Sequence, residues 1–328
     1  MRSTGGRPEP RLPIRLIALD IDGTLVDDDL LLRDRTRAAV RGAVERGVRV
    51  SLATGRMASS AVVFAEALGI RDPIVAFQGA LVREMPAPGA RARGGAVRPV
   101  GRIIAHEPLA ADVAREAIRW SRAHGLEPHV NHLERFILPK DDPRADDYSS
   151  FLGARATFVP DLEASVRRPV TKVISVGDPR VPMELLAAGR AAFAGRAEVT
   201  LSHPRFLEFV APGVSKGRAL ARLARRSGIP LSQTLAVGDQ WNDAEMIAAA
   251  GHGAAMPSAP AEIRRTARYV VRPLADEGAA RLIEDLVLAS PAAAARSLVR
   301  WLEDGARARA AAEAELGVPP PSVEARPA

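Results

Sequence analysis

A short apolar run that ends in two aspartates constrains the fold of this chain more than any other feature of its sequence. Residues Ile14 to Leu19 are mostly apolar and lead directly into Asp20, a spacer, Asp22 and the pair Gly23-Thr24. Such a run predicts a buried strand with acidic side chains at its carboxyl end, the edge of an open α/β sheet where ligands bind. Asp20 and Asp22 project to the same side if the strand conformation continues through them. The pattern alone is equally compatible with an aspartate-rich turn in which Asp22 caps a backbone amide.

Further apolar strands, each followed by a loop and a helix, predict the fold class. The strands Val48–Ala53 and Ile74–Phe77 end at Thr54-Gly55-Arg56 and at Gln78-Gly79-Ala80, and the same rhythm returns after Pro212. Short buried strands that alternate with helices are typical of a parallel sheet covered on both faces. We therefore expect an α/β fold with a doubly wound, Rossmann-like parallel-sheet core.

The middle of the chain does not follow this alternation of strands and helices. The segment Met85–Pro99 is rich in Pro, Gly, Ala and Arg, and the short strands around His132-Leu133-Glu134 are adjacent enough to favour antiparallel pairing. We expect this part to be a separate α+β domain inserted into the core. The predicted organisation is a disordered leader over 1–13, a core over 14–83 and 204–289, an inserted cap over 84–203, and an Ala/Arg-rich helical tail with a disordered end over 290–328.

Composition excludes several classes of protein. The 328 residues include no cysteine, which excludes disulfides and thiolate metal sites and fits a reducing compartment. No apolar run approaches the ~18 residues that predict a membrane span, and the polar N-terminus has no apolar stretch typical of a secretory signal. We expect a cytoplasmic protein, monomeric or a small homo-oligomer, with no membrane partner.

The basic charge does not by itself predict nucleic-acid binding. The formal net charge is +7, yet the basic residues are scattered and interspersed with acids, as in Arg33-Asp-Arg-Thr-Arg37. Only three of the 46 basic residues are lysines, so a lysine indicates a position where arginine is inadequate; they are Lys140, Lys172 and Lys216. A non-catalytic binding protein, for nucleic acid, remains an alternative of lower rank.

Four polar segments lie at strand ends or helix starts, and a parallel sheet can bring all of them to one edge. They are Asp20-x-Asp22-Gly-Thr24, Thr54-Gly55-Arg56, Lys216, and Gly238-Asp239-x-x-Asn242-Asp243. Two like charges ~4 Å apart repel by about 4 kcal/mol at an effective dielectric near 20, so the acids need a cation. Oxygen donors without His or Cys favour Mg²⁺. A hydroxyl, an ammonium and helix N-termini can hold a phosphate, which together predicts phosphoryl transfer through an aspartyl intermediate.

These segments, in this order, resemble the haloacid dehalogenase (HAD) superfamily of phosphatases, and the Cof-type subgroup in particular. The inserted domain after the third strand, the run Phe209–Gly217 and the run Gly238–Met246 carry the narrower resemblance, which covers about Ile14 to Leu288. The chain differs from the subgroup at Gln78 and Ser258, where Asn is usual.

The resemblance assigns catalytic roles to residues of this chain. It implies that Asp20 is the nucleophile that takes the phosphoryl group, and that Asp22 is the general acid and base. It also implies that Thr54, Gly55 and Lys216 hold the phosphate. The implied reaction is Mg²⁺-dependent hydrolysis of a small phosphorylated metabolite, such as a sugar phosphate or a nucleotide or cofactor phosphate. A phosphotransferase or phosphomutase of the same superfamily is the alternative.

The same resemblance assigns the metal ligands and their support. Mg²⁺ would be bound by Asp20, by the backbone carbonyl of Asp22 and by Asp239, while Asn242 and Asp243 would support the metal or position the lysine.

Each of these residues also has a purely structural interpretation. Thr54 and Gly55 could form a helix cap and a turn, Lys216 could be solvated, and Asp239 could be an N-cap. Arg56 could form either a salt bridge or a contact on the phosphate side. In the cap, six polar residues are candidates for substrate contacts, although a solvated face of a small sheet is the favoured interpretation of each: His129, Asn131, His132, Arg135, Lys140 and Lys172.

Overall fold

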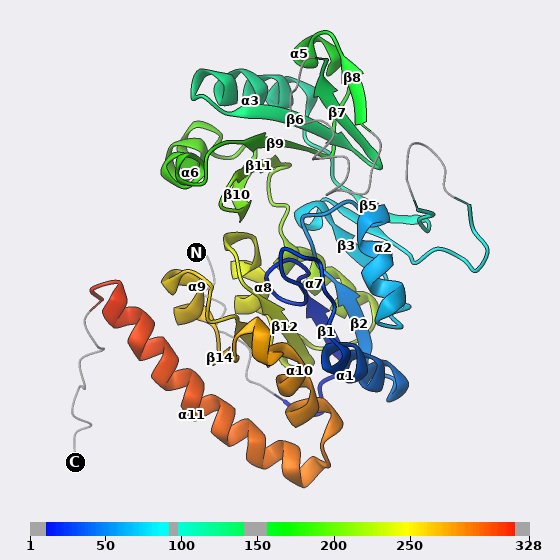
Figure 1. Ribbon diagram of the computed structural model, residues 1–328, viewed down its shortest axis with the longest axis vertical. Coiled ribbons are helices and arrows are strands. Elements are labelled where there is room, and N and C mark those ends of the chain that lie inside the picture. Colours follow the sequence, from blue (N-terminus) through cyan, green and yellow to red (C-terminus); the bar gives the residue numbers. More distant parts are fainter. Residues whose placement is uncertain (1–10, 92–97, 141–155, 319–328) are drawn as a thin grey trace.

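The protein consists of a parallel-sheet core and an inserted mixed-sheet cap that lies above it in Figure 1. The computed structural model describes residues 11–91, 98–140 and 156–318. In these residues, no helix combines the length and apolar character needed to cross a bilayer.

The core sheet has five parallel strands in the order β14-β13-β12-β1-β2. Each strand is short and almost entirely buried, as expected for a sheet covered by helices on both faces. The predicted doubly wound α/β core is thus confirmed. The strands are β1 (Leu16–Leu19), β2 (Arg49–Leu52), β12 (Thr234–Gly238), β13 (His252–Ala255) and β14 (Tyr269–Val270). The helices of this part are α1 (Asp34–Glu45), α2 (Ala58–Ala67), α7 (Lys216–Arg226), α8 (Ala244–Ala249), α9 (Ala261–Thr266) and α10 (Gly278–Ile283).

A second, three-stranded sheet continues the core beyond β2. Its strands are β3 (Ile74–Ala76), β4 (Leu81–Arg83) and β5 (Ile103–His106), joined in antiparallel pairs. A single parallel bridge between Ala53 and Val75 connects β3 to the end of β2. The sequence pattern did not predict β4, and the predicted cap included β5, whereas β5 pairs with β4 on the core side.

The cap sheet has six strands in the order β10-β11-β9-β6-β7-β8, all antiparallel except the pair β7 and β8. Helices cover the face that points away from the core (Figure 1). The strands are β6 (Glu127–His132), β7 (Arg135–Pro139), β8 (Ala156–Val159), β9 (Lys172–Val176), β10 (Glu198–His203) and β11 (Phe206–Val210), and the helices are α3 (Ala111–Ala123), α5 (Leu162–Ser165) and α6 (Arg180–Ala192).

The expected return to the core at residue 204 falls inside a hairpin of the cap sheet. Strand β11 pairs with both β10 and β9, so the cap sheet extends to Val210. The sequence of an apolar strand does not show which of two sheets it joins, because that depends on its hydrogen-bonding neighbours. The predicted end of the cap, at residue 203, is therefore too early. The helix predicted over Asp142–Gly153 lies outside the described residues.

After α10, the chain forms α11 (Pro291–Glu315), which runs diagonally below the core in Figure 1. It lies against α9 and β14, the edge strand of the core sheet. A Cβ at Gly305 would lie 1.8 Å from the carbonyl oxygen of Arg268, so glycine lets the helix backbone approach the sheet edge. The helix thereby covers an edge that would otherwise expose unpaired backbone groups.

A buried histidine in the core sheet makes the stability of the fold sensitive to acid. His252 of β13 is fully buried, and its Nδ1 lies 2.9 Å from the hydroxyl of Tyr269. Burial lowers the pKa of His252 to about 4, against a smaller opposing contribution from the backbone of Arg11. The unfolded chain therefore takes up the proton first as the pH falls through about 6.5.

We expect the free energy of unfolding to lose about 2 kcal/mol between pH 7.5 and pH 5 through His252 alone, because only the unfolded state is protonated there. Urea unfolding gives the free energy of unfolding of the wild type and of His252→Gln at both pH values. The change with pH should be about 2 kcal/mol larger for the wild type. The control His124→Gln changes an exposed histidine and keeps the wild-type dependence. Parallel pH profiles for the wild type and His252→Gln would contradict the assignment.

Candidate active site

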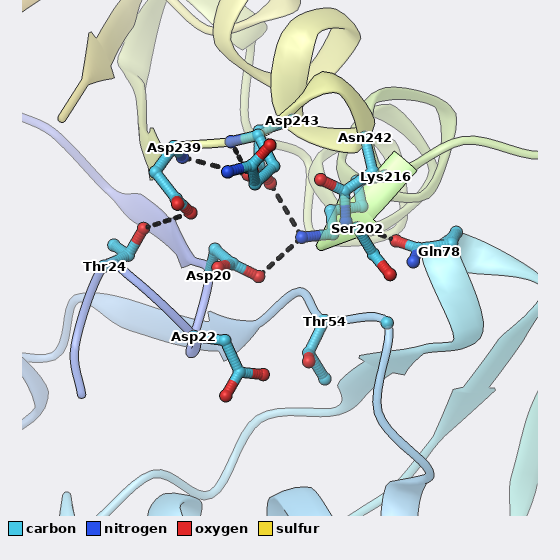
Figure 2. Close-up of polar contacts among 12 residues, drawn as sticks. Asp20, Asp22, Thr24, Thr54, Gln78, Ser202, Lys216, Asp239, Asn242 and Asp243 are labelled. Carbon is cyan, nitrogen blue, oxygen red and sulfur yellow. Dashed lines mark hydrogen bonds and ion pairs between the residues drawn. The ribbon is translucent and has the colours of Figure 1, made fainter. Parts of the chain in front are cut away.

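Three buried carboxylates meet at the carboxyl ends of two neighbouring core strands. Asp20 follows β1, Asp239 follows β12, and Asp243 lies one turn later, where α8 begins. Because β1 and β12 pair directly, their ends are adjacent, and Figure 2 shows the three side chains converging there. One carboxylate oxygen from each residue lies within 4.8 Å of the others. The structure thus brings two distant acidic segments of the sequence together.

Lys216, the first residue of α7, provides the positive charge at this cluster. Its Nζ donates hydrogen bonds to Oδ1 of Asp20 at 2.5 Å and to Oδ1 of Asp243 at 2.7 Å. The side chain is fully buried, which rules out the solvated interpretation. An ammonium at a helix N-terminus is opposed by the helix dipole, so the two carboxylates have to outweigh that effect.

The pKa values follow from burial and from crowding of like charges. Burial raises the pKa of Asp20 well above its usual range; Lys216 offsets part of this effect, while Asp243 and Asp239 add to it. Burial, with Asp243, raises the pKa of Asp239 to about 7. Burial alone would lower the pKa of Lys216, but Asp20 and Asp243 hold it above its usual value. One ammonium therefore balances only part of the charge of three carboxylates.

The cluster fits a hard divalent cation. Its donors are carboxylate oxygens, and within the described residues no His or Cys belongs to it. Oxygen donors of this kind favour Mg²⁺ over softer metals. When all three acids are ionised, two negative charges remain after pairing with Lys216, which matches the charge of such an ion.

The loop after Asp20 approaches the cluster closely. Gly23 has a φ of +76°, and a Cβ there would lie 2.3 Å from Oδ2 of Asp239. The hydroxyl of Thr24 donates to Oδ1 of Asp239 at 3.3 Å. Glycine at this position therefore allows the backbone to pass beside the acids.

Asp22 lies apart from the carboxylate cluster and pairs with Arg56. Nε and one terminal nitrogen of Arg56 donate to the two carboxylate oxygens of Asp22 at 2.7 and 2.5 Å. Of the two interpretations of Arg56, the structure contains the salt bridge. Thr54 is buried, and its hydroxyl oxygen accepts the backbone N–H of Arg56 at 3.1 Å. That arrangement leaves the Thr54 proton available to an acceptor.

A polar network joins the cap to the core beside these residues. In the cap, Nζ of Lys172 donates to Glu208 at 2.7 Å and to the carbonyl oxygen of Gly55 at 3.0 Å. Gln78 of the core donates to Glu208 at 3.0 Å and accepts from Asn242 at 2.7 Å. Asn242 therefore contacts Gln78, whereas Asp243 is the residue that contacts Lys216.

A cavity lies between the core loops and the cap, next to Asp20. Segments after β1, β2 and β12 form its core side, and strands β9, β10 and β11 form its cap side. The residues that line it are Asp20, Asp22, Gly23, Asp27, Asp28, Leu30, Gly55, Arg56, Lys172, Ile174, Ser202, His203, Phe206, Glu208 and Asn242.

Glu208, and the hydroxyl of Ser202 that donates to it, were not among the residues predicted from the sequence. An acid in the otherwise apolar run Phe206-Leu-Glu-Phe-Val210 was the available signal. Among the six polar candidates in the cap, Lys172 lines the cavity in the described part of the chain. His129 is buried against Phe136, with ring centroids 5.4 Å apart.

Comparison with known proteins identifies the family. The profile of the haloacid dehalogenase-like hydrolases matches residues 17–283. The chain belongs to this family. It is a phosphatase of the Cof type, which confirms the resemblance seen in the sequence.

Similar proteins match along most of the chain. An HMP-PP phosphatase of Cronobacter sakazakii is 28% identical over 75% of this chain and 85% of its own length. A 5-amino-6-(5-phospho-D-ribitylamino)uracil phosphatase of Bacillus subtilis is 25% identical over 84% and 96%. A haloacid dehalogenase-like hydrolase from B. subtilis, of known structure, superimposes with a TM-score of 0.69 at 24% identity, covering 83% of this chain and 100% of that one. The last likeness supports the fold.

We expect Lys216→Met to lower the free energy of unfolding by about 3 kcal/mol at pH 8 without divalent cations, because Asp20 and Asp243 stay buried without their counter-charge. Denaturant unfolding measures the change. The matched control Lys140→Met alters an exposed lysine and shifts stability by less than ~0.5 kcal/mol. Equal stabilities of the two variants would show that the buried ammonium does not hold the cluster together.

Proposed function

We propose that this phosphatase hydrolyses a small phosphorylated metabolite with Mg²⁺, through a phosphoryl group carried by Asp20. The substrate class is a sugar phosphate or a nucleotide or cofactor phosphate. One observation carries the proposal: the Asp20 carboxylate is held against Lys216 beside a cavity that Asp22 also lines. The relatives named for HMP-PP and for a phosphorylated ribitylaminouracil support substrates of this size.

In the first step, a carboxylate oxygen of Asp20 attacks phosphorus and the bond to the leaving oxygen breaks. Asp22 gives its proton to that leaving oxygen. A protonated Asp22 cannot accept from Arg56 through both oxygens while one of them donates to the leaving oxygen, so Asp22 loosens its pairing with Arg56 to act as the acid. Between the two steps Asp22 is again a carboxylate, and its ion pair with Arg56 holds it in position.

In the second step, Asp22 takes a proton from water as the water oxygen attacks phosphorus, which releases inorganic phosphate and regenerates Asp20. The hydroxyl of Thr54, the backbone N–H of Gly55 and Nζ of Lys216 are the proposed donors to the phosphate oxygens. Lys216 can balance charge on the transferring group because it is already held at Asp20.

The residues that would hold Mg²⁺ are Asp20, Asp239 and the backbone carbonyl of Asp22, with Asp243 beside them. When bound, the ion offsets the negative charge of the acids and of the phosphate, which otherwise repel each other. Asp243 orients this part of the site, because its Oδ2 accepts the backbone N–H groups of Asp239 and Gln240 at 3.0 and 3.1 Å.

We expect Asp20→Asn to lower the release of inorganic phosphate by about 1,000-fold or more, because an amide is not a nucleophile here. The assay uses a panel of phosphorylated metabolites without an added acceptor, with and without Mg²⁺, and measures free phosphate. Asp29→Asn, at an exposed position, is the matched control and keeps the wild-type rate. Full Mg²⁺-dependent activity of Asp20→Asn would refute the aspartyl mechanism, and phosphate transfer to a second hydroxyl without free phosphate would favour the phosphotransferase alternative.

We expect Asp239→Asn to weaken Mg²⁺ binding at least about tenfold, because the change removes one charged ligand. Titration calorimetry with Mg²⁺ alone measures the affinity, and chelation by EDTA followed by added Mg²⁺ tests whether activity is lost and restored. Asp29→Asn again serves as the control. Unchanged Mg²⁺ affinity of Asp239→Asn would place the ion elsewhere.

A further inference from the structure

A second cleft lies on the opposite face of the cap sheet from the catalytic cavity. Asn131 of β6 pairs in register with Lys172, so both side chains point to the face that borders the catalytic cavity. His132 points to the other face, as does Arg135, its partner in β7, and both line the second cleft. Among the described residues, none lines both spaces.

Arginines dominate the lining of this second cleft, which we call the arginine cleft. Within residues 11–91, 98–140 and 156–318, Glu134 is the one acidic residue that lines it. In the same residues, the side chains of three of its arginines are exposed and form no ion pair: Arg135, Arg167 and Arg168. The fourth arginine is Arg83. The two basic side chains that line the catalytic cavity are, by contrast, both paired with acids.

Glu134 does not neutralise the three exposed arginines, because its two oxygens are used elsewhere. Its Oε1 lies 3.3 Å from Nε of Arg83, whose side chain is only 11% exposed. Its Oε2 accepts the backbone N–H of Ser59, at the start of α2, at 3.1 Å. A terminal nitrogen of Arg83 also donates to the carbonyl oxygen of Gly101 at 2.8 Å. Glu134 and Arg83 therefore form a buried contact between cap and core at one end of the cleft.

Two histidines beside the cleft show that its positive charge is not balanced. Burial, and then the charge of Arg135, lower the pKa of His132. His106 of β5 lies with its ring 5.9 Å from that of His132, and burial, His132 and Arg83 lower its pKa. In the described part of the chain, Nδ1 of His132 is buried and has no hydrogen-bond partner. A concave surface of one charge concentrates the field and attracts ions of the opposite charge.

The size and the apolar part of the lining favour a small organic ligand. The volume of the cleft is about 780 Å³, and small-molecule sites span roughly 300–1,000 Å³. Partly exposed apolar side chains lie beside the arginines, and they are those of Val100, Leu133 and Ile137. An inorganic ion leaves this apolar surface in contact with water, whereas the carbon skeleton of an organic ion covers it.

We propose that the arginine cleft is a second binding site, for a small organic anion that carries two carboxylate or phosphate groups. Guanidinium groups bind both kinds of oxyanion through two parallel hydrogen bonds. Arg83 belongs to the core, and Arg135, Arg167 and Arg168 belong to the cap, so the bound anion contacts both parts of the protein. The inference does not depend on the reaction proposed at Asp20.

The test is titration calorimetry of the whole protein without Mg²⁺, at ~0.15 M salt, where exposed charges are screened beyond about 8 Å. Three probes share one ring and differ in charge: isophthalate has two carboxylates, benzoate has one, and isophthalamide has none. We expect isophthalate to bind at least about tenfold more tightly than benzoate, because its second carboxylate engages a second guanidinium. We expect isophthalamide not to bind measurably.

A fourth probe, benzene-1,3-diphosphonate, identifies the preferred oxyanion, because it keeps the ring and resists hydrolysis. Tighter binding of the diphosphonate assigns the cleft to phosphate compounds, and tighter binding of isophthalate assigns it to carboxylates. Both results support an oxyanion site.

Variants locate the binding. Replacing two exposed arginines of the cleft together, Arg135→Gln and Arg168→Gln, should weaken isophthalate binding at least about tenfold. The matched control, Arg46→Gln with Arg122→Gln, removes the same charge at exposed positions outside the cleft and keeps the wild-type affinity. Circular dichroism checks that both double variants are folded.

Three results would overturn the proposal. The first is isophthalate binding no more tightly than benzoate. The second is an affinity for isophthalate that the double change in the cleft leaves intact. The third is an equal loss in the control variant, which would show a general attraction of anions to a basic surface. Since calorimetry is done without substrate or Mg²⁺, each of these results leaves the proposed phosphatase function untouched.

Discussion

One buried ammonium holds the acidic end of the core sheet together. Nζ of Lys216 lies between Asp20 and Asp243, in a place closed to water, where opposite charges attract strongly and an unpaired charge is costly. The parallel pairing of β1 and β12 forces Asp239 into the same space, so one positive charge faces three carboxylates. The site therefore carries an excess of negative charge, which a bound divalent cation would offset.

The cap contacts the core beside this cluster through polar groups. Glu208 and Lys172 of the cap reach Gln78 and Gly55 of the core by hydrogen bonds. Hydrogen bonds of this kind can be exchanged for bonds to water at a small net cost, whereas separating an apolar interface exposes its whole area. The contact is not polar throughout, because Phe136 and Leu138 of the cap pack in the same apolar cluster as residues of the core. The polar contacts place Lys172 and Glu208 of the cap at the cavity that Asp20 lines.

The sequence predicted the core well because its strands are short, apolar and each followed by a loop with recognisable polar residues. It missed β4, since the reversal before that strand depends on left-handed backbone at Phe77, Gln78 and Gly79, which only glycine signals in a sequence. It also ended the cap before β11. A mostly apolar strand such as β11 fits either sheet, and its partner is decided by which edge lies beside it.

By itself, the sequence determined that Asp20 and Asp239 meet, because parallel strands bring their carboxyl ends to one edge whatever lies between them. The tertiary structure decided which acidic side chain forms an ion pair with which lysine or arginine. Asp22 pairs with Arg56 and Asp243 with Lys216, while Glu208 joins Lys172 across the cap sheet. Ion pairs act over a few ångströms, and the order of residues along a chain does not specify distances of that size between segments that are far apart in sequence.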